Sequence, residues 1–147
     1  MFKSKSPDET KKIGFYYGER AKAGEVYCLY GGLGAGKTVF AKGFALGLGV
    51  PCDEVVSPTF TIAREYGGRL PFFHLDVYRL GAEDMLEIGF FDYIGGDGVT
   101  LIEWAERVEE LLPPGSVRIN ITRDAADDGA RFIDGDFLRR GGENIEK

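Results

Sequence analysis

The stretch Gly31-Gly32-Leu33-Gly34-Ala35-Gly36-Lys37-Thr38 decides the fold, because it matches the Walker A pattern of a glycine, any four residues and then Gly-Lys-Thr. The short, mostly apolar run 25–30 before it predicts a strand buried on both faces, as in a parallel sheet. The apolar spacing after it predicts a helix that ends near Gly47-Leu48-Gly49. A strand, a glycine loop and a helix in this order are the context that makes the pattern specific.

Each part of this loop suits a polyphosphate. Its glycines let backbone N–H groups approach a phosphate closely, and the helix N-terminus adds its positive dipole end. Lys37 can supply a mobile charge to the β- and γ-phosphates, and the Thr38 hydroxyl can ligate Mg²⁺. A glycine-rich turn with a chance Gly-Lys-Thr is the weaker interpretation. We therefore predict that a nucleoside triphosphate is bound by Gly32, Leu33, Gly34, Ala35, Gly36, Lys37, Thr38 and Val39.

Two acidic residues follow apolar runs and are candidates for the catalytic side of such a site. Glu103 follows the run 99–102, and Asp76 follows the run 70–73 by a few residues. Glu103 fits the acid that holds the metal and its water shell, which leaves Asp76 to position or polarise the attacking water. Either residue could instead be an ordinary carboxylate at a strand end.

Other polar and aromatic residues near these acids are open to two interpretations. His74 is the only histidine, and a lone imidazole in an apolar strand is more often a hydrogen-bonded structural group than a catalyst. Trp104 suits either the core or a ring that covers the nucleotide or a partner. Arg64 and Arg79 could neutralise charge at the phosphates, but their spacing does not single them out.

Composition limits the remaining function classes. With 147 residues we expect a single domain over 1–147, and 18 basic against 24 acidic residues give a net charge of −6, which argues against a broad grip on nucleic acid. No run is long and apolar enough for a membrane span, and the N-terminus lacks the apolar core of a signal peptide, so we expect a cytoplasmic protein. Cys28 and Cys52 match neither a disulfide framework nor a metal motif.

The rest of the chain predicts an α/β fold. Ser6 and Glu9 form a capping box for a helix from Pro7 to about Ala23. The chain has 22 glycines, about twice the average usage, which indicates that glycine serves backbone geometry in parts of the fold. The further predicted elements are strands 55–66 and 70–80 joined through Gly67-Gly68, a helix 82–94, a strand 99–102, a polar helix ending at Leu112, and strands 117–122 and 131–133, with a frayed tail from 139. We expect a P-loop NTPase-like three-layer sandwich with a central, partly parallel sheet and antiparallel edge strands.

Four blocks in this short chain resemble one family, the TsaE (YjeE) small P-loop ATPases, which bacteria require to make threonylcarbamoyladenosine beside the tRNA anticodon. The blocks occur in the family's order and approximate spacing, and the likeness extends to about Pro113. They are the glycine loop, Ser57-Pro58-Thr59-Phe60-Thr61, His74-x-Asp76-x-Tyr78-Arg79 and Glu103-Trp104.

The resemblance implies roles for these residues and partners for the chain. It implies ATP as the nucleotide, Mg²⁺ held by Thr38 and Glu103, and switch-like segments 57–61 and 74–79 near the γ-phosphate. From the residues themselves we expect Lys37, Asp76 and Glu103 to be catalytic, and of the two interpretations of Trp104 we place it among the nucleotide-binding residues. The resemblance also implies that ATP hydrolysis resets a complex of the proteins TsaD and TsaB, with tRNA contacted only indirectly, which agrees with the acidic charge. Self-association of the chain alone stays open.

Three positions depart from the family's pattern. Gly32 stands where the family usually has Asp, Val39 where it has Thr or Ser, and Ala105 where Pro is common. Gly32 removes any side-chain role at that position and leaves a looser loop, which costs backbone entropy when a ligand binds. None of the three removes Lys37 or Thr38.

Two alternatives remain beside an ATP-hydrolysing accessory subunit. A small kinase for a nucleoside or metabolite needs an acceptor pocket and usually an Arg-bearing lid, and the short segments between the motifs argue against both. A nucleotide-gated binding module that never hydrolyses is disfavoured by the presence of both Asp76 and Glu103.

Overall fold

The computed structural model describes residues 2–32, 34–51, 63–79, 81–87 and 89–135. Its strands are β1 (Phe2–Ser4), β2 (Val26–Tyr30), β3 (Ala63–Gly67), β4 (Pro71–Asp76), β5 (Val99–Glu103), β6 (Val117–Asp124) and β7 (Asp127–Gly135). Its helices are α1 (Pro7–Arg20), α2 (Lys37–Gly47) and α3 (Ala82–Glu87), with 3-10 segments η1 (Phe90–Tyr93) and η2 (Ala105–Leu111). None of the helices in these ranges has the length and apolar character that crossing a bilayer requires.

The seven strands form one sheet in the order β1-β7-β6-β2-β5-β4-β3. The central strands β6, β2, β5 and β4 are parallel, whereas β3 and β7 pair antiparallel to their neighbours and β1 pairs antiparallel to β7. The predicted fold class, a partly parallel sheet with antiparallel edges, is therefore confirmed. The parallel register places Glu103 opposite both Leu29 and Asp76, so the carboxyl ends of three strands meet at one edge of the sheet.

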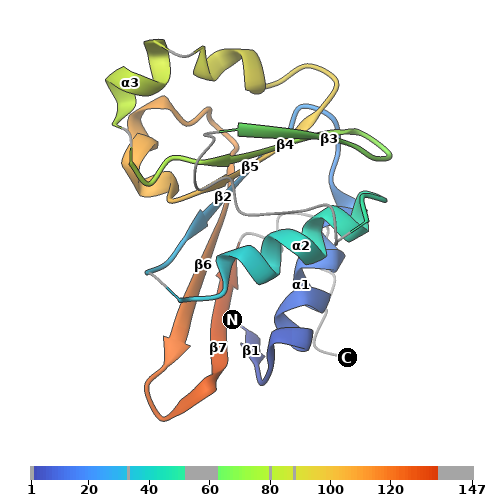
Figure 1. Ribbon diagram of the computed structural model, residues 1–147, viewed down its shortest axis with the longest axis vertical. Coiled ribbons are helices and arrows are strands. Elements are labelled where there is room, and N and C mark those ends of the chain that lie inside the picture. The colour runs from blue at the N-terminus through green and yellow to red at the C-terminus, as the bar shows by residue number, and fades with distance from the viewer. Residues whose placement is uncertain (1, 33, 52–62, 80, 88, 136–147) are drawn as a thin grey trace.

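Two hydrophobic clusters lie on opposite faces of the sheet. Strand β2 shows the division, since Tyr27 and Leu29 join one cluster and Val26 and Cys28 join the other. The first cluster lies under α1 and α2, which lie next to each other on one side of the sheet (Figure 1). The second lies under α3, η1 and η2, so helical segments cover both faces as a three-layer fold requires.

Helices α1 and α2 approach so closely that side chains are excluded from their crossing. A Cβ atom added at Gly18 would overlap the backbone of Phe44, and one added at Gly43 would overlap the backbone of Lys11. Gly14 and Gly47 are equally crowded by the opposing helix. This crossing accounts for part of the high glycine content.

Several elements differ from their predicted bounds. The helix expected over 82–94 is two separate segments, because Gly89 adopts a left-handed conformation with φ of 83° between them. The polar helix before Pro113 is a 3-10 segment kinked at Val108. The helix expected to reach Ala23 ends at Arg20, and the closing strands are longer than predicted and joined by the unpredicted edge strand β1.

Other predictions agree with the structure or lie outside it. Ser6 caps α1 by accepting a hydrogen bond from the Glu9 N–H at 3.2 Å, and strands β3 and β4 form the predicted antiparallel pair, although β4 ends at Asp76 and does not continue toward residue 80. Cys28 is buried and unbridged. Cys52, the block 57–61 and the tail from 139 lie outside the described residues.

Candidate functional site

The loop between β2 and α2 adopts a conformation that only glycine accommodates easily. Gly31, Gly34 and Gly36 have φ angles of 152°, 73° and 103°, and Gly36 directly precedes the first helical residue, Lys37. Gly32 differs, since its φ is not positive and an added Cβ would meet no atom within 4 Å. The backbone therefore does not require glycine at position 32. Leu33 lies outside the described residues.

Lys37 is folded into the loop and is only 5% exposed. Its Nζ donates a hydrogen bond to the Gly31 carbonyl at 2.5 Å and lies 3.1 Å from the centroid of the Trp104 ring, a cation–π contact. Burial lowers the pKa of Lys37, and nearby carboxylates oppose that effect. These carboxylates belong to Glu103, Glu106 and Asp76. Three carboxyl groups thus act electrostatically on one ammonium, but no group of three His, Cys, Asp or Glu side chains within the described part of the chain could hold a metal ion alone.

Glu103 ends β5 and is held by a histidine. Its Oε2 lies 2.6 Å from His74 Nε2, and both side chains are buried. The His74 ring stacks against Phe72 at 5.9 Å, and its Nδ1 has no hydrogen-bond partner within the described part of the chain. His74 is thus bonded inside the fold, as expected for a lone histidine in an apolar strand, and it fixes the orientation of the Glu103 carboxylate.

Asp76 ends β4 and lies directly opposite Glu103 in the parallel register. Its Oδ1 accepts a hydrogen bond from the Tyr78 N–H at 3.0 Å. Burial raises the pKa of Asp76, and the negative charge of Glu103 raises it further against the Tyr78 hydrogen bond and the charges of His74 and Lys37. A carboxylate with a raised pKa is a stronger base than an exposed one.

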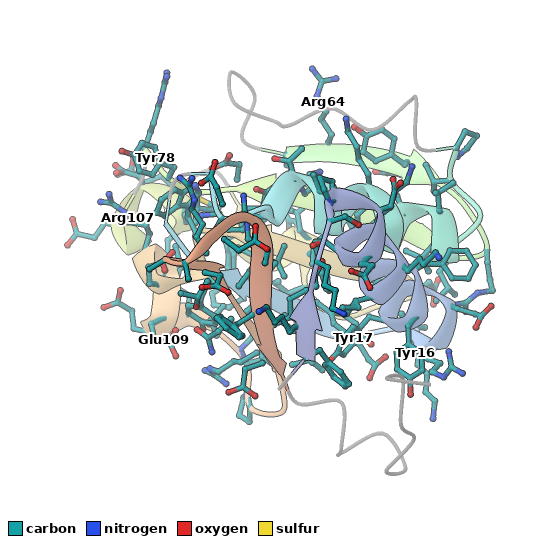
Figure 2. All side chains as sticks on the ribbon, turned by 90° about the horizontal axis from the view of Figure 1, so that it is seen from below. Tyr16, Tyr17, Arg64, Tyr78, Arg107 and Glu109 are labelled. Atoms are coloured by element: carbon teal, nitrogen blue, oxygen red, sulfur yellow. The ribbon has the colours of Figure 1, made fainter. Side chains whose placement is uncertain are left out.

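Trp104 is the one non-glycine residue with positive φ in the described ranges, at 63°. Its ring packs at 4.6 Å from Tyr78, and the Arg107 guanidinium lies 5.2 Å from the Tyr78 ring. Figure 2 shows Tyr78 and Arg107 close together at one end of the molecule. A bulky residue held in the left-handed region is strained, and such strain concentrates at functional sites.

The remaining residues that the sequence singled out are partly or fully exposed. Thr38 and Val39 lie in the first turn of α2 and are partly exposed. Arg64 is exposed on edge strand β3 and points away from the body of the molecule (Figure 2). Arg79 is exposed after β4 and has at least one interaction of its own.

Two residues at the site were missed by sequence reasoning. Glu106, whose pKa is raised chiefly by burial, acts electrostatically on Lys37, and its position three residues after Glu103 is the only clue that the sequence offers. Arg131 donates hydrogen bonds to the carbonyls of Ala35 and Gly34 at 2.9 and 3.1 Å. No local pattern marks it.

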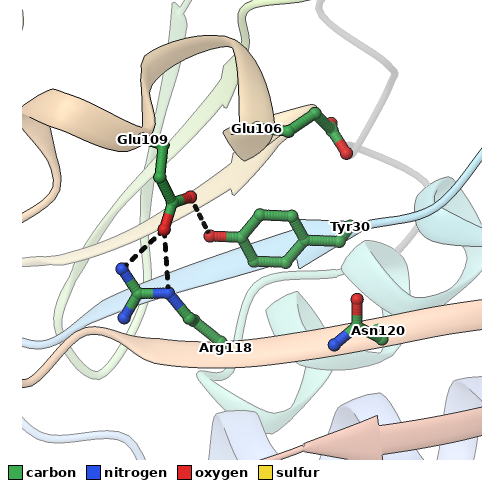
Figure 3. Close-up of a pocket in the computed structure, with 5 residues that line it drawn as sticks. All are labelled: Tyr30, Glu106, Glu109, Arg118 and Asn120. Carbon is green, nitrogen blue, oxygen red and sulfur yellow. Dashed lines mark hydrogen bonds and ion pairs between the residues drawn. The ribbon is translucent and has the colours of Figure 1, made fainter.

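A pocket of about 430 Å³ adjoins the loop, because Tyr30 on its wall directly precedes Gly31. Its lining residues are Tyr30, Glu106, Glu109, Arg118 and Asn120. The Tyr30 hydroxyl donates to Glu109 at 2.6 Å, and Arg118 donates to the other carboxylate oxygen at 2.9 and 3.2 Å (Figure 3). Burial and the hydrogen bond to Glu109 raise the pKa of the Tyr30 phenol.

A parallel strand, a glycine loop and a helix, with an acidic residue ending the adjoining strand, define the chain as a P-loop NTPase-like α/β protein. Residues 4–133 match the family model described as "Threonylcarbamoyl adenosine biosynthesis protein TsaE". The chain belongs to the TsaE family.

Individual relatives agree with this family. The chain is 50% identical over 124 residues to a tRNA threonylcarbamoyladenosine biosynthesis protein TsaE of Bacillus subtilis. The aligned region makes up 84% of this chain and 77% of the relative. It is 46% identical over 119 residues to the TsaE protein of Treponema pallidum, covering 80% and 87% of the two chains. The crystal structure of Bacillus subtilis YdiB is similar with a TM-score of 0.73 and 43% identity, over 90% of this chain and 80% of that one.

Proposed function

We propose that the chain binds Mg·ATP in the loop 31–38 and hydrolyses it in the service of tRNA threonylcarbamoyladenosine synthesis, acting on a complex of the proteins TsaD and TsaB. The observation that carries the proposal is the register of the sheet edge, which sets Asp76 and Glu103 side by side next to the loop that holds Lys37. The membership of the family and the names of its relatives support the process.

The loop residues have separate tasks in nucleotide binding. Backbone N–H groups of the loop and the first turn of α2 would hold the β-phosphate, and Lys37 would neutralise the β- and γ-phosphate charge. Thr38 and Glu103 would hold Mg²⁺ together with phosphate oxygens and water, since hydroxyl and carboxylate oxygens are donors that this ion prefers. His74 occupies one Glu103 oxygen, which leaves the second for the metal side.

Hydrolysis needs a base and a stabilised leaving group. Asp76 is suited to take the proton of the attacking water, since burial makes its carboxylate more basic. The water oxygen bonds to the γ-phosphorus, the bond from that phosphorus to the bridging oxygen breaks, and ADP leaves with its charge balanced by Lys37. The proton held by Asp76 then passes to solvent or phosphate.

The position of Lys37 supports slow turnover by the chain alone. Its ammonium is engaged by the Gly31 carbonyl and the Trp104 ring, and it must leave both to reach a phosphate. A partner that rearranges Trp104 would release it. We propose that TsaD and TsaB supply this rearrangement, while tRNA is contacted only through the complex.

The test measures phosphate release from Mg·ATP by the chain alone and with TsaD and TsaB from the same source. Release should rise with the partners, and Lys37→Ala should lower it by about hundredfold, because it removes the charge that stabilises the transferred phosphoryl group. Lys22→Ala is the matched control, since Lys22 is exposed beyond the end of α1. Partners that neither bind nor stimulate would contradict the proposed process, and phosphate found on a small acceptor would indicate a kinase.

A further inference from the structure

Arg131 connects the C-terminal hairpin to the glycine loop 31–38, called the phosphate loop below. It lies on β7, and in Figure 1 the hairpin of β6 and β7 runs past the loop between β2 and α2. Its Nε donates to the Ala35 carbonyl at 2.9 Å and its Nη2 to the Gly34 carbonyl at 3.1 Å, across 96 and 97 residues of sequence. Its Nη1 donates to the carbonyls of Asp128 and Ala130 at 2.6 and 2.8 Å, which ties the guanidinium to its own hairpin.

These bonds set the direction of the loop's N–H groups. In a trans peptide the carbonyl and the N–H point to opposite sides, and every described peptide bond is trans. Holding the Ala35 carbonyl toward Arg131 therefore turns the Gly36 N–H away from Arg131. The Gly34 carbonyl acts in the same way on the Ala35 N–H, which donates to the Gly32 carbonyl across the loop at 3.2 Å.

The bonding of Arg131 differs from that of its neighbour across the hairpin. Arg123 faces Arg131 in the strand register and also lies beside Gly34, but its guanidinium forms an ion pair with the Asp128 carboxylate. Arg131 forms four hydrogen bonds to backbone carbonyls, and no ion pair joins it to a carboxylate among the residues that the structure describes. A planar guanidinium can hold several carbonyls in fixed directions, whereas an ammonium cannot reproduce that geometry.

We propose that Arg131 is a positioning residue that holds the second half of the phosphate loop in the conformation that binds the β-phosphate. The inference rests on the proposed nucleotide binding by this loop. It predicts that the hairpin of β6 and β7, although distant in sequence, determines the affinity of the loop for nucleotide. Arg131 acts through the backbone of Gly34 and Ala35, without a contact to the nucleotide.

The test compares Arg131→Gln, Arg131→Lys and Arg123→Gln by titration calorimetry with Mg·ADP and Mg·ATP, and by hydrogen exchange of the amides of 34–36 without nucleotide. Arg131→Gln should raise Kd about tenfold for both nucleotides, because both present a β-phosphate to the same N–H groups. Its loop amides should exchange faster. Arg131→Lys should resemble Arg131→Gln, and Arg123→Gln should keep Kd within about twofold of the original.

Other results would contradict the proposed role of Arg131 or the nucleotide binding on which it rests. An unchanged Kd and unchanged exchange in Arg131→Gln would show that Arg131 does not position the loop. Full nucleotide affinity in Arg131→Lys, or a loss of affinity in Arg123→Gln equal to that in Arg131→Gln, would show that positive charge matters and that the planar geometry of the guanidinium does not. If Arg131→Gln fails to fold, Arg131→Lys decides by the same measurements. An original chain that binds neither nucleotide would overturn the proposed function itself.

Discussion

The two faces of the sheet are covered in different ways. One carries two regular helices of 14 and 11 residues that cross with glycines at the contact and bury the rings of Tyr17, Phe40 and Phe44. The other carries a six-residue helix and two 3-10 segments and leaves Leu86 and Phe91 49% and 56% exposed. Close helix packing is therefore confined to the face that carries α1 and α2, while irregular backbone on the other face carries Trp104 and Glu106.

The largest effect should come from breaking the closely packed face. Gly18→Ala places a methyl group against the backbone of Phe44, so α1 and α2 must separate. We expect the free energy of unfolding to fall by about 3 kcal/mol, measured by urea denaturation.

Gly81→Ala is the matched control on the other face. An added Cβ there meets no atom within 4 Å, and the backbone at Gly81 is not left-handed. The free energy of unfolding should change by less than about 0.5 kcal/mol. Equal losses in the two variants would contradict the contrast between the faces.

Backbone strain on the irregular face can be measured at Trp104. Trp104→Ala and Trp104→Gly remove nearly the same contacts, but only glycine adopts φ of 63° without cost. The glycine variant should therefore be more stable than the alanine variant by about 1 kcal/mol in urea denaturation, the reverse of the usual order. An alanine variant of equal or greater stability would show that position 104 carries no backbone strain.

The smallest effect should come from removing the charge of Asp76 at the edge of the sheet. The folded-state pKa of Asp76 is raised by burial, so its ionised form destabilises the fold above that pKa, and the penalty disappears below the ordinary pKa of an aspartate. Asp76→Asn should raise Tm by about 2 °C at pH 7. It should leave Tm unchanged at a pH low enough to protonate Asp76 in both the folded and the unfolded protein. Phosphate release should be lost in the same variant. A Tm difference that does not vary with pH would refute the electrostatic cause.

Local patterns predicted the parts of this molecule that depend on neighbouring residues. The glycine loop, the capping of α1 by Ser6 and the antiparallel pair through Gly67 each follow from a few adjacent side chains. The sequence singled out Asp76 and Glu103 as acids that follow apolar runs, but their proximity is a finding of the structure, in which β4 ends at Asp76 and pairs parallel with β5.

Long-range contacts could not be predicted in this way. The bond from His74 to Glu103 depends on the register between β4 and β5, and the bonds from Arg131 to the loop depend on how the last hairpin is placed. The break at Gly89 was misjudged because the apolar rhythm of 82–94 continues through a residue whose left-handed backbone ends the helix.

The contact between Lys37 and Trp104 gives the chain its own optical reporter. Trp104 is the only tryptophan, so all indole emission comes from the ring that the Lys37 ammonium touches at 3.1 Å. An ammonium that moves from the indole to a phosphate changes the electric field at the fluorophore. Under the proposed function, a change in this emission would time the binding of nucleotide in the unlabelled protein, separately from the release of phosphate.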